Sequence, residues 1–296
     1  MLFRVLKCFE NENLINFSVQ QKMRTNSQFS LTEYLRAARD YYDGICSRKY
    51  RALVIDYDNT IHNKRERLQV EVDIRKILNE MLRNGIIIGV ATGNGEYIQE
   101  ELREYFDYTY HSSIVIGYYN CGIITSLDKD TKLPSGNLEI PMEFRLLKRY
   151  YYENGLDEYI ISEGFEDDNP YELNFYSEAG EIGVAYLEKL KEFITTRTSL
   201  KILNSPHSFD VIPPWISKLD LCKYLRGKGI LFNQILTMGD CGAIGESDYE
   251  LLRCENSLSV NTVSEELYSC WKFTPTECIN LDATWFYLKT MEFCEP

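Results

Sequence analysis

The chain has 296 residues, of which 44% are hydrophobic and 26% are charged, a composition typical of a soluble globular protein with a sizeable core. Its formal net charge of −13 excludes nucleic acid as an expected partner, because the phosphate backbone would be repelled. No run of about 18 apolar residues occurs, so we expect no membrane span, and we expect no signal peptide in the first residues. None of the nine cysteines belongs to a Cys-x-x-Cys pair, which favours a reducing cytoplasm over a zinc site or a disulfide framework.

The first thirty residues, 1–30, show no clear periodicity, and we expect them to form a loosely attached N-terminal extension. A helix follows, because Ser30 and Glu33 form a capping-box pattern. Apolar residues then continue at helical spacing as far as Ile45.

Apolar strands alternate with helices between residues 52 and 106. The expected elements are strands at 52–55 and 86–91 and helices at 74–82 and 97–106. The strand segments are continuously apolar, as in parallel strands that are buried on both faces. The predicted fold class is therefore α/β, with a parallel sheet covered by helices on both sides.

The pattern changes between residues 114 and 212, where acidic and Asn/Pro/Gly turns separate short strands and two helical patches. We expect strands at 114–116, 123–124, 173–176 and 209–212 and helices at 143–152 and 182–194. After residue 218 the earlier pattern returns, with strands at 235–238 and 258–260 and a last helix at 283–291. The predicted organisation is an α+β cap domain, residues 114–212, inserted into a core made of 31–113 and 213–296.

Two carboxylates, Asp56 and Asp58, follow the strand at 52–55. The carboxyl end of a strand is where open α/β sheets bind ligands. Two carboxylates placed together there would repel each other unless a divalent cation neutralised them. An Asx-rich turn is the alternative interpretation. An EF-hand loop is excluded, since Ile61 occupies the position that requires glycine.

Three weaker polar signals accompany this pair. Thr92-Gly93-Asn94 follows the second strand and precedes a helix, where a hydroxyl and backbone N–H groups can hold phosphate. Lys218 opens a later helix. Asp240 follows the strand at 235–238, and Asp248 lies further along the same loop. Each signal alone also fits an ordinary turn.

The four motifs occur along the chain in the order Asp-x-Asp-x-Thr, Thr-Gly, Lys and Gly-Asp…Asp. Together they resemble the haloacid dehalogenase (HAD) superfamily from about Leu53 onward. The resemblance implies a Rossmann-like core and a Mg²⁺-dependent phosphatase. It implies that Asp56 is the nucleophile, which becomes an aspartyl-phosphate, and that Asp58 is the general acid and base. The implied phosphate-binding residues are Thr92, Gly93, Asn94 and Lys218. The implied Mg²⁺ ligands are Asp56, Asp58 through its backbone carbonyl, Asp240 and Asp248.

The place of the inserted domain resembles the C2 cap of the Cof-type (IIB) branch, whose members mostly hydrolyse sugar phosphates and related metabolites. The Asn120-Gly122 segment resembles the turn that leads into that cap. A small phosphorylated metabolite is therefore the expected substrate, held in a pocket that the cap closes. His207 and Asp210 are candidate substrate contacts, although a polar turn explains them equally well.

The metal loop departs from the usual Gly-Asp-x-x-Asn-Asp pattern of the branch, because a longer segment separates Asp240 from Asp248. Either Asp248 supports the metal through water, or Glu246 takes that place. Two other functions stay open. A phosphomutase would use the same aspartyl-phosphate but normally has a helical cap. A binding or regulatory protein would keep the fold without turnover, which the complete set of motif residues disfavours.

Overall fold

The structure is a computed structural model and describes residues 1–6, 12–25, 28–63, 69–131, 140–205 and 208–295. Its largest sheet has six strands in the order β11-β10-β2-β3-β4-β5. They are β2 (Ala52–Asp56), β3 (Ile87–Ala91), β4 (Ile114–Tyr118), β5 (Ile123–Ser126), β10 (Ile235–Gly239) and β11 (Ser257–Ser259). All neighbours run parallel except β4 and β5, which are antiparallel. The predicted α/β class is confirmed.

Both faces of this sheet are buried, as the continuously apolar strands predict. Along β2, Leu53 and Ile55 join one apolar cluster, whereas Ala52 and Val54 join a second cluster on the opposite face. The first cluster is covered by α2 (Leu31–Ser47), α3 (Gln69–Arg83), α4 (Gln99–Tyr105) and α9 (Leu281–Leu288). The second is covered by α7 (Leu219–Gly227) together with α8 (Tyr249–Leu252).

Local sequence signals define the helix ends where they were expected. The Ser30 Oγ accepts a hydrogen bond from the Glu33 backbone N–H at 3.4 Å, and the Glu33 carboxylate accepts one from the Ser30 backbone N–H at 2.7 Å. This is the predicted capping box, and it begins α2. Gly85, with a φ of +74°, follows the end of α3, as expected of a residue that stops a helix.

The expected start of the inserted domain at residue 114 is corrected by the strand pairing. β4 hydrogen-bonds to β3 and β5 hydrogen-bonds to β4, so residues 114–126 belong to the core sheet. The local pattern could not reveal this, because an apolar run predicts a strand but not its neighbours.

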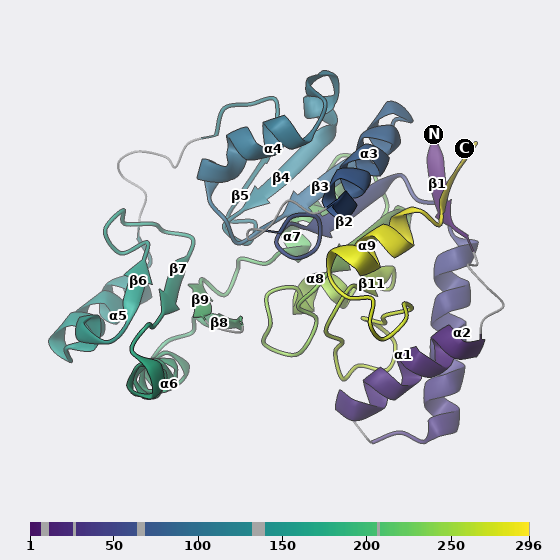
Figure 1. Cartoon of the computed structure of the whole chain (residues 1–296). Helices are drawn as coiled ribbons and strands as arrows, with labels where there is room; N and C mark the ends of the chain where they lie inside the picture. The colour runs from purple at the N-terminus through teal and green to yellow at the C-terminus, as the bar shows by residue number, and fades with distance from the viewer. Residues whose placement is uncertain (7–11, 26–27, 64–68, 132–139, 206–207, 296) are drawn as a thin grey trace.

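The remaining insertion forms a separate α+β layer, visible on the left of Figure 1. Its antiparallel sheet has the order β6-β7-β9-β8. The strands are β6 (Ile161–Glu163), β7 (Leu173–Tyr176), β8 (Lys201–Asn204) and β9 (Ser208–Ile212), and the helices are α5 (Met142–Glu153) and α6 (Gly180–Arg197). Both helices pack against one face of this sheet, where Phe175 and Phe209 are buried. Alternation along the strands places the remaining side chains on the opposite face of this sheet, which is available for contact with the core.

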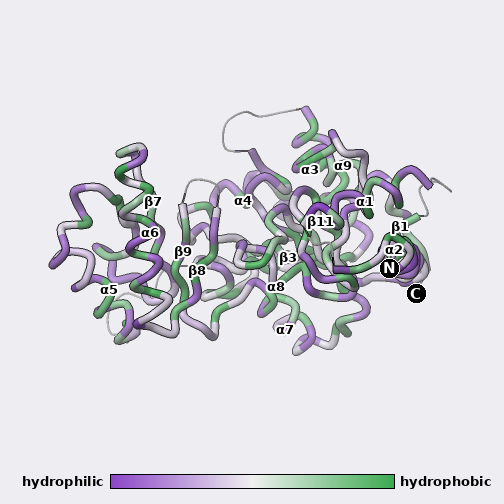
Figure 2. Tube along the Cα trace, turned by 90° about the horizontal axis from the view of Figure 1, so that it is seen from below, coloured by the Kyte–Doolittle hydropathy of each residue, from purple (hydrophilic) through white to green (hydrophobic). Residues whose placement is uncertain are grey.

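The N-terminal extension is attached more firmly than expected. β1 (Leu2–Val5) pairs antiparallel with β12 (Met291–Cys294), so the two termini lie together at the end of the core away from the cap (Figures 1 and 2). α1 (Glu12–Thr25) contributes Ile15 and Val19 to the main core. Among the described residues, no helix combines the length and the apolar character that crossing a bilayer requires.

One buried cation fixes α1 in place. The Lys22 Nζ donates hydrogen bonds to the backbone oxygens of Ser264 at 2.9 Å, Glu266 at 2.5 Å and Ser269 at 2.7 Å. It also lies 5.0 Å from the centroid of the Trp271 ring, which is within reach of a cation–π interaction. Burial lowers the pKa of Lys22 to about 8.

Candidate active site

Three parallel strands bring the motif residues to one edge of the core sheet. Asp56 ends β2 and pairs in register with Ala91 at the end of β3, so Thr92 lies just beyond that edge. β10 runs on the other side of β2 and is followed directly by Asp240. Because the carboxyl ends of parallel strands share an edge, side chains from distant parts of the sequence meet there.

Lys218, which begins α7, joins two of the carboxylates. Its Nζ donates to the Asp56 Oδ1 and to the Asp248 Oδ1, each at 2.7 Å. All three side chains are buried, with 3%, 5% and 0% of their surface exposed. The other Asp56 oxygen, Oδ2, accepts a hydrogen bond from the Thr60 hydroxyl at 2.9 Å. The orientation of the Asp56 carboxylate is therefore fixed on both sides.

The geometry fits a divalent cation. One carboxylate oxygen from each of Asp56, Asp240 and Asp248 lies within 4.8 Å of the others, and all three residues are buried. Hard oxygen donors grouped in this way are the ligands that Mg²⁺ prefers. The structure thus brings together three of the four predicted metal ligands through their side chains.

The long loop after β10 returns Asp248 to the site. The Asp248 Oδ2 accepts hydrogen bonds from the backbone N–H groups of Asp240 at 2.9 Å and Cys241 at 3.2 Å. This return requires a glycine at 239, because a Cβ there would lie 2.5 Å from the Asp248 Oδ2. Glu246 instead accepts from the Ala243 backbone N–H at 2.8 Å, within the loop itself. Asp248, rather than Glu246, faces the carboxylate cluster.

The crowded carboxylates perturb one another. Burial, followed by the nearby Asp248 carboxylate, raises the pKa of Asp56 well above its usual value, and Lys218 opposes this rise. The same two causes raise the pKa of Asp240 to about 7. Burial alone would lower the pKa of Lys218, but Asp248 and Asp56 outweigh it and raise that pKa, so the ammonium is charged. A site with excess negative charge of this kind is suited to a bound cation.

A second group of polar side chains lies on the β3 side of Asp56. The Asn94 Nδ2 donates to the Asp58 Oδ2 at 2.6 Å and to the Thr92 Oγ1 at 3.0 Å. The Thr92 Oγ1 also accepts from the Asn94 backbone N–H at 2.9 Å, so its own O–H can donate to a ligand. Asn94, predicted only as part of a phosphate cradle, therefore also orients Asp58.

Two cap residues, Glu172 and Asp210, and the core residue Asn120 approach this loop at Gly93. A Cβ on Gly93 would lie 3.7 Å from the Asp210 Oδ2, 3.6 Å from the Glu172 Oε1 and 3.4 Å from the Asn120 Nδ2. Asp210 thus lies where a substrate contact was predicted. His207 lies outside the described residues. Glu172 was not predicted as a site residue, and no spacing in the sequence connects it with Gly93.

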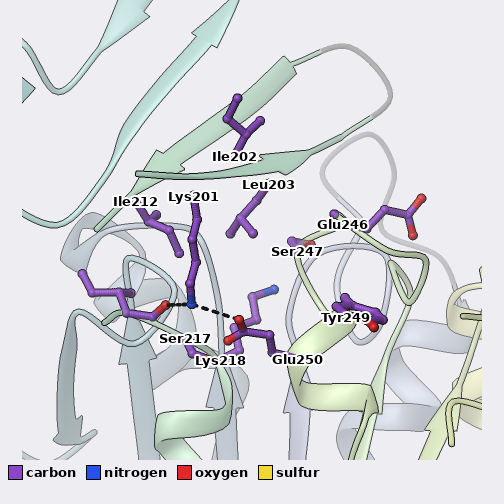
Figure 3. A pocket seen from close by; sticks show the side chains of 12 residues that line it. Lys201, Ile202, Leu203, Ile212, Ser217, Lys218, Glu246, Ser247, Tyr249 and Glu250 are labelled. Atoms are coloured by element: carbon purple, nitrogen blue, oxygen red, sulfur yellow. Dashed lines mark hydrogen bonds and ion pairs between the residues drawn. The ribbon is translucent and has the colours of Figure 1, made fainter. Parts of the chain in front are cut away.

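A cavity of about 290 Å³ lies where the cap meets the metal loop. Lys201 and Leu203 point into it from the cap strand β8, and Lys218 borders it from the core (Figure 3). The Lys201 Nζ donates to the Ile216 backbone oxygen at 3.1 Å and to the Glu250 carboxylate at 2.9 Å, which joins the cap to the core (Figure 3). The Asn204 backbone N–H donates to the Gly245 oxygen at 2.8 Å, so the cap also touches the loop that carries Asp248.

The chain thus has an α/β core with carboxylates at its strand ends and an inserted α+β cap. No protein-family model matches this sequence, and no curated protein matches it. Solved structures do match in fold. A HAD/COF-like hydrolase from Plasmodium vivax is similar over 84% of this chain and 98% of its own, with 16% identity and a TM-score of 0.59. An IMP-bound IMP-nucleotidase from Plasmodium falciparum is similar over 93% and 79%, with 11% identity and a TM-score of 0.58.

A haloacid dehalogenase-like hydrolase from Bacteroides thetaiotaomicron is also similar, over 71% of this chain and 88% of its own, with 15% identity and a TM-score of 0.50. The chain therefore has the haloacid dehalogenase fold, with the inserted α+β cap that the sequence motifs imply.

Proposed function

We propose that the protein is a Mg²⁺-dependent phosphatase that hydrolyses a small phosphomonoester, with Asp56 as the nucleophile. One observation carries this proposal: at one sheet edge, Asp56 is bonded to Lys218 and clustered with Asp240 and Asp248, while Asp58 lies beside Thr92 through Asn94. The arrangement supplies a nucleophile, a cation, a metal site and a proton donor around one point.

The chemistry proceeds in two steps. An Asp56 carboxylate oxygen attacks phosphorus, the bond from phosphorus to the leaving oxygen breaks, and Asp58 gives that oxygen its proton. Asp58, now a carboxylate, accepts a proton from water as the water oxygen attacks the aspartyl-phosphate. Inorganic phosphate leaves and Asp56 is regenerated, so both carboxyl groups return to their starting states.

Charge neutralisation is the main task of the remaining residues, because phosphoryl transfer spreads negative charge over the phosphoryl oxygens. The Lys218 ammonium, which already contacts Asp56, would offset this charge, and the Thr92 hydroxyl would donate to a phosphoryl oxygen. Asp56, Asp240 and Asp248 would hold Mg²⁺, with the Asp58 backbone carbonyl as a further ligand. When bound, Mg²⁺ supplies electrostatic stabilisation of the transferring group.

The cap supports a small metabolite as the substrate, since it can exclude water and shape a pocket over the sheet edge. The similar Plasmodium falciparum protein is an IMP-nucleotidase bound to IMP, which is consistent with a small phosphorylated ligand in this fold. A cytoplasmic location is part of the proposal, and the free thiols of the eight described cysteines suit a reducing compartment.

The test is Mg²⁺-dependent release of phosphate from p-nitrophenyl phosphate. We expect Asp56→Asn to lower the rate by about 10³-fold or more, because the amide is not a nucleophile and no second residue replaces it. Asp40→Asn, on the exposed surface of α2, is the matched control and should keep full activity. Unchanged turnover in Asp56→Asn would refute the mechanism.

The same assay separates the two alternatives. A phosphomutase would return the phosphoryl group to a sugar phosphate and release little phosphate. A regulatory protein would bind a phosphorylated ligand without releasing phosphate from any member of a broad panel.

A further inference from the structure

The open face of the cap sheet is acidic where it meets the loop Thr92-Gly93-Asn94, called the phosphate loop below. Strand pairing places Glu163 opposite Asn174 and Asn174 opposite Asp210, so these three side chains share one face. Phe175 and Phe209 point the other way, into the cap core. Glu172 directly precedes β7, and its Oε1 lies 3.6 Å from the point that a Gly93 Cβ would occupy.

Glu172 is the most constrained of these acids. It is 7% exposed, and its Oε2 accepts a hydrogen bond from the Asn120 Nδ2 at 2.7 Å. Its other oxygen, Oε1, lies 3.6 Å from the point that a Gly93 Cβ would occupy. Glu172 therefore reaches from the cap to the loop that would hold the phosphoryl group.

Asn120 gives independent evidence of a missing partner. Its side chain is fully buried, and its Oδ1 accepts no hydrogen bond, which is costly for a buried amide. Its Nδ2 lies 3.4 Å from the same point beside Gly93. Around this one point beside Gly93 therefore lie the Asn120 Nδ2, the Glu172 Oε1 and the Asp210 Oδ2, and the two carboxylate oxygens are acceptors for a donor on a ligand held near this loop.

An aromatic ring borders the same region. Tyr97 is 72% exposed, although its hydroxyl is anchored to the Asn94 Oδ1 at 2.7 Å. Burial of the hydroxyl, followed by the carboxylates of Asp58, Glu172 and Glu163, raises the pKa of Tyr97 to about 12. These three acids therefore act electrostatically on an exposed aromatic residue, and an aromatic face in a negative field is suited to a cation.

The negative charge of these residues favours a cationic ligand over a neutral one. A buried carboxylate costs free energy unless a cation compensates it. The cation that acts on Glu172 is Lys218, and its Nζ is already bonded to Asp56 and Asp248. Sugar hydroxyls could be bound equally well by neutral amides or hydroxyls, so they do not require this many acids. A second anionic group on the substrate would be repelled.

We propose that the leaving group of the substrate carries a cationic nitrogen, as in a phosphorylated amino alcohol or amino sugar, and that Glu172, Glu163 and Tyr97 receive that cation. This inference rests on the proposed phosphatase function. The phosphoryl group lies at Asp56 and Lys218, and the ammonium group lies between the phosphate loop and the open face of the cap sheet.

Two substrate pairs matched in shape but not in charge test this inference. Phosphocholine is compared with 3,3-dimethylbutyl phosphate, and glucosamine 6-phosphate with glucose 6-phosphate, using the full chain with Mg²⁺. We expect kcat/KM for the cationic member of at least one pair to exceed that of its neutral partner by about tenfold to 100-fold, the range of one charge-assisted contact. Glu172→Gln should bring that ratio close to one. Glu181→Gln, exposed on α6, is the matched control and should preserve the ratio.

The outcomes separate the two proposals. If the neutral members of both pairs react as fast as the cationic members, or faster, the cationic leaving group is refuted while the phosphatase stands. If no compound, including p-nitrophenyl phosphate, releases phosphate, the proposed function fails and this inference fails with it. Because the substrate comparison uses the unaltered protein, a folding defect in the Glu172 variant cannot mask the result.

Discussion

At the scale of single residues, the proposed function gives two neighbouring carboxylates different tasks, and their surroundings differ accordingly. Asp56 is buried and held by Lys218 and Thr60, which suits a fixed nucleophile. Asp58 is half-buried and oriented by Asn94, which suits a group that exchanges protons with a leaving group and with water.

Asp58→Asn should separate the two chemical steps. p-Nitrophenolate leaves without a proton, so this variant should release a burst of p-nitrophenol, about one per active site, and then turn over slowly because the water is no longer activated. Alkyl phosphates, which need the proton, should slow by about 10²- to 10⁴-fold and show no burst. Stopped-flow absorbance measures the burst, and Asp56→Asn, which should lack it, is the control. Full steady-state activity in Asp58→Asn would exclude it as the acid and base.

Glu172 should make the free energy of unfolding depend on pH. Burial and Asp210 raise its pKa in the folded protein, so above about pH 4.5 the folded protein holds this proton more tightly than the unfolded chain does. The free energy of unfolding that this group contributes therefore falls as the pH rises.

Glu172→Gln removes that titration. Relative to the unaltered protein, we expect the variant to gain stability as the pH rises above about 4.5, until the pH exceeds the raised pKa of Glu172 in the folded protein. Urea unfolding at several pH values measures the difference, and Glu181→Gln provides the exposed comparison. A difference that does not change with pH would show that Glu172 is not a buried titrating acid.

The residues nearest the chemistry could be predicted because each follows an apolar strand or opens a helix within a few positions. Asp56, Thr92 and Asp240 are examples. Glu172 and Asn120 could not be predicted as neighbours, because only the folding of the cap onto the core brings them beside Gly93. The choice of Asp248 over Glu246 likewise depends on the path of the loop, which residue types alone do not determine.

At the scale of elements, the N-terminal helix α1 stabilises a loop that continues toward the candidate metal site. Lys22 holds the backbone of residues 264–269. Cys270 follows, and its Sγ lies 3.7 Å from the Gly242 backbone oxygen, close to Asp240. Helix α1 is therefore part of the scaffold of the candidate site, although the weak periodicity of the first thirty residues predicted a loose extension.

Lys22→Met should be strongly destabilising. The variant keeps the apolar stem but leaves three carbonyl oxygens without their donor, which costs roughly 3 kcal/mol in the free energy of unfolding. Urea denaturation measures this loss, with Lys76→Met as the control, because the Lys76–Asp73 pair is exposed on α3 and worth about 0–1 kcal/mol. A stability equal to that of the control variant would refute the structural role of Lys22.

The strands and helices themselves were largely predictable, since apolar runs and capping residues are local signals. The pairing partners of the strands could not be predicted. β4 and β5 were assigned to the cap because their short apolar runs resemble those of the later strands, whereas hydrogen bonds to β3 place them in the core. β1 and β12 pair across almost the whole chain, and no local pattern specifies a contact at that distance in sequence.

At the scale of the whole molecule, the site exists only when core, cap and metal loop are assembled. Asp56, Lys218 and Asp248 come from three separate segments, and the cap contacts the metal loop through Asn204 and Gly245. In the proposed function, the sheet edge would provide the phosphoryl chemistry, and the acidic face of the cap would select the leaving group. Closure of the cap on the substrate would exclude water and strengthen every charge interaction in the site.

The most direct test of this account is to identify the atom that accepts the phosphoryl group. The protein is mixed with Mg²⁺ and an excess of acetyl phosphate, quenched in acid within one turnover, digested, and analysed by mass spectrometry. The account predicts one phosphoryl group on the peptide that contains Asp56, at that residue, and none in Asp56→Asn. Phosphate release by the unaltered protein with no phosphorylated aspartate, or with the group on another residue, would contradict it.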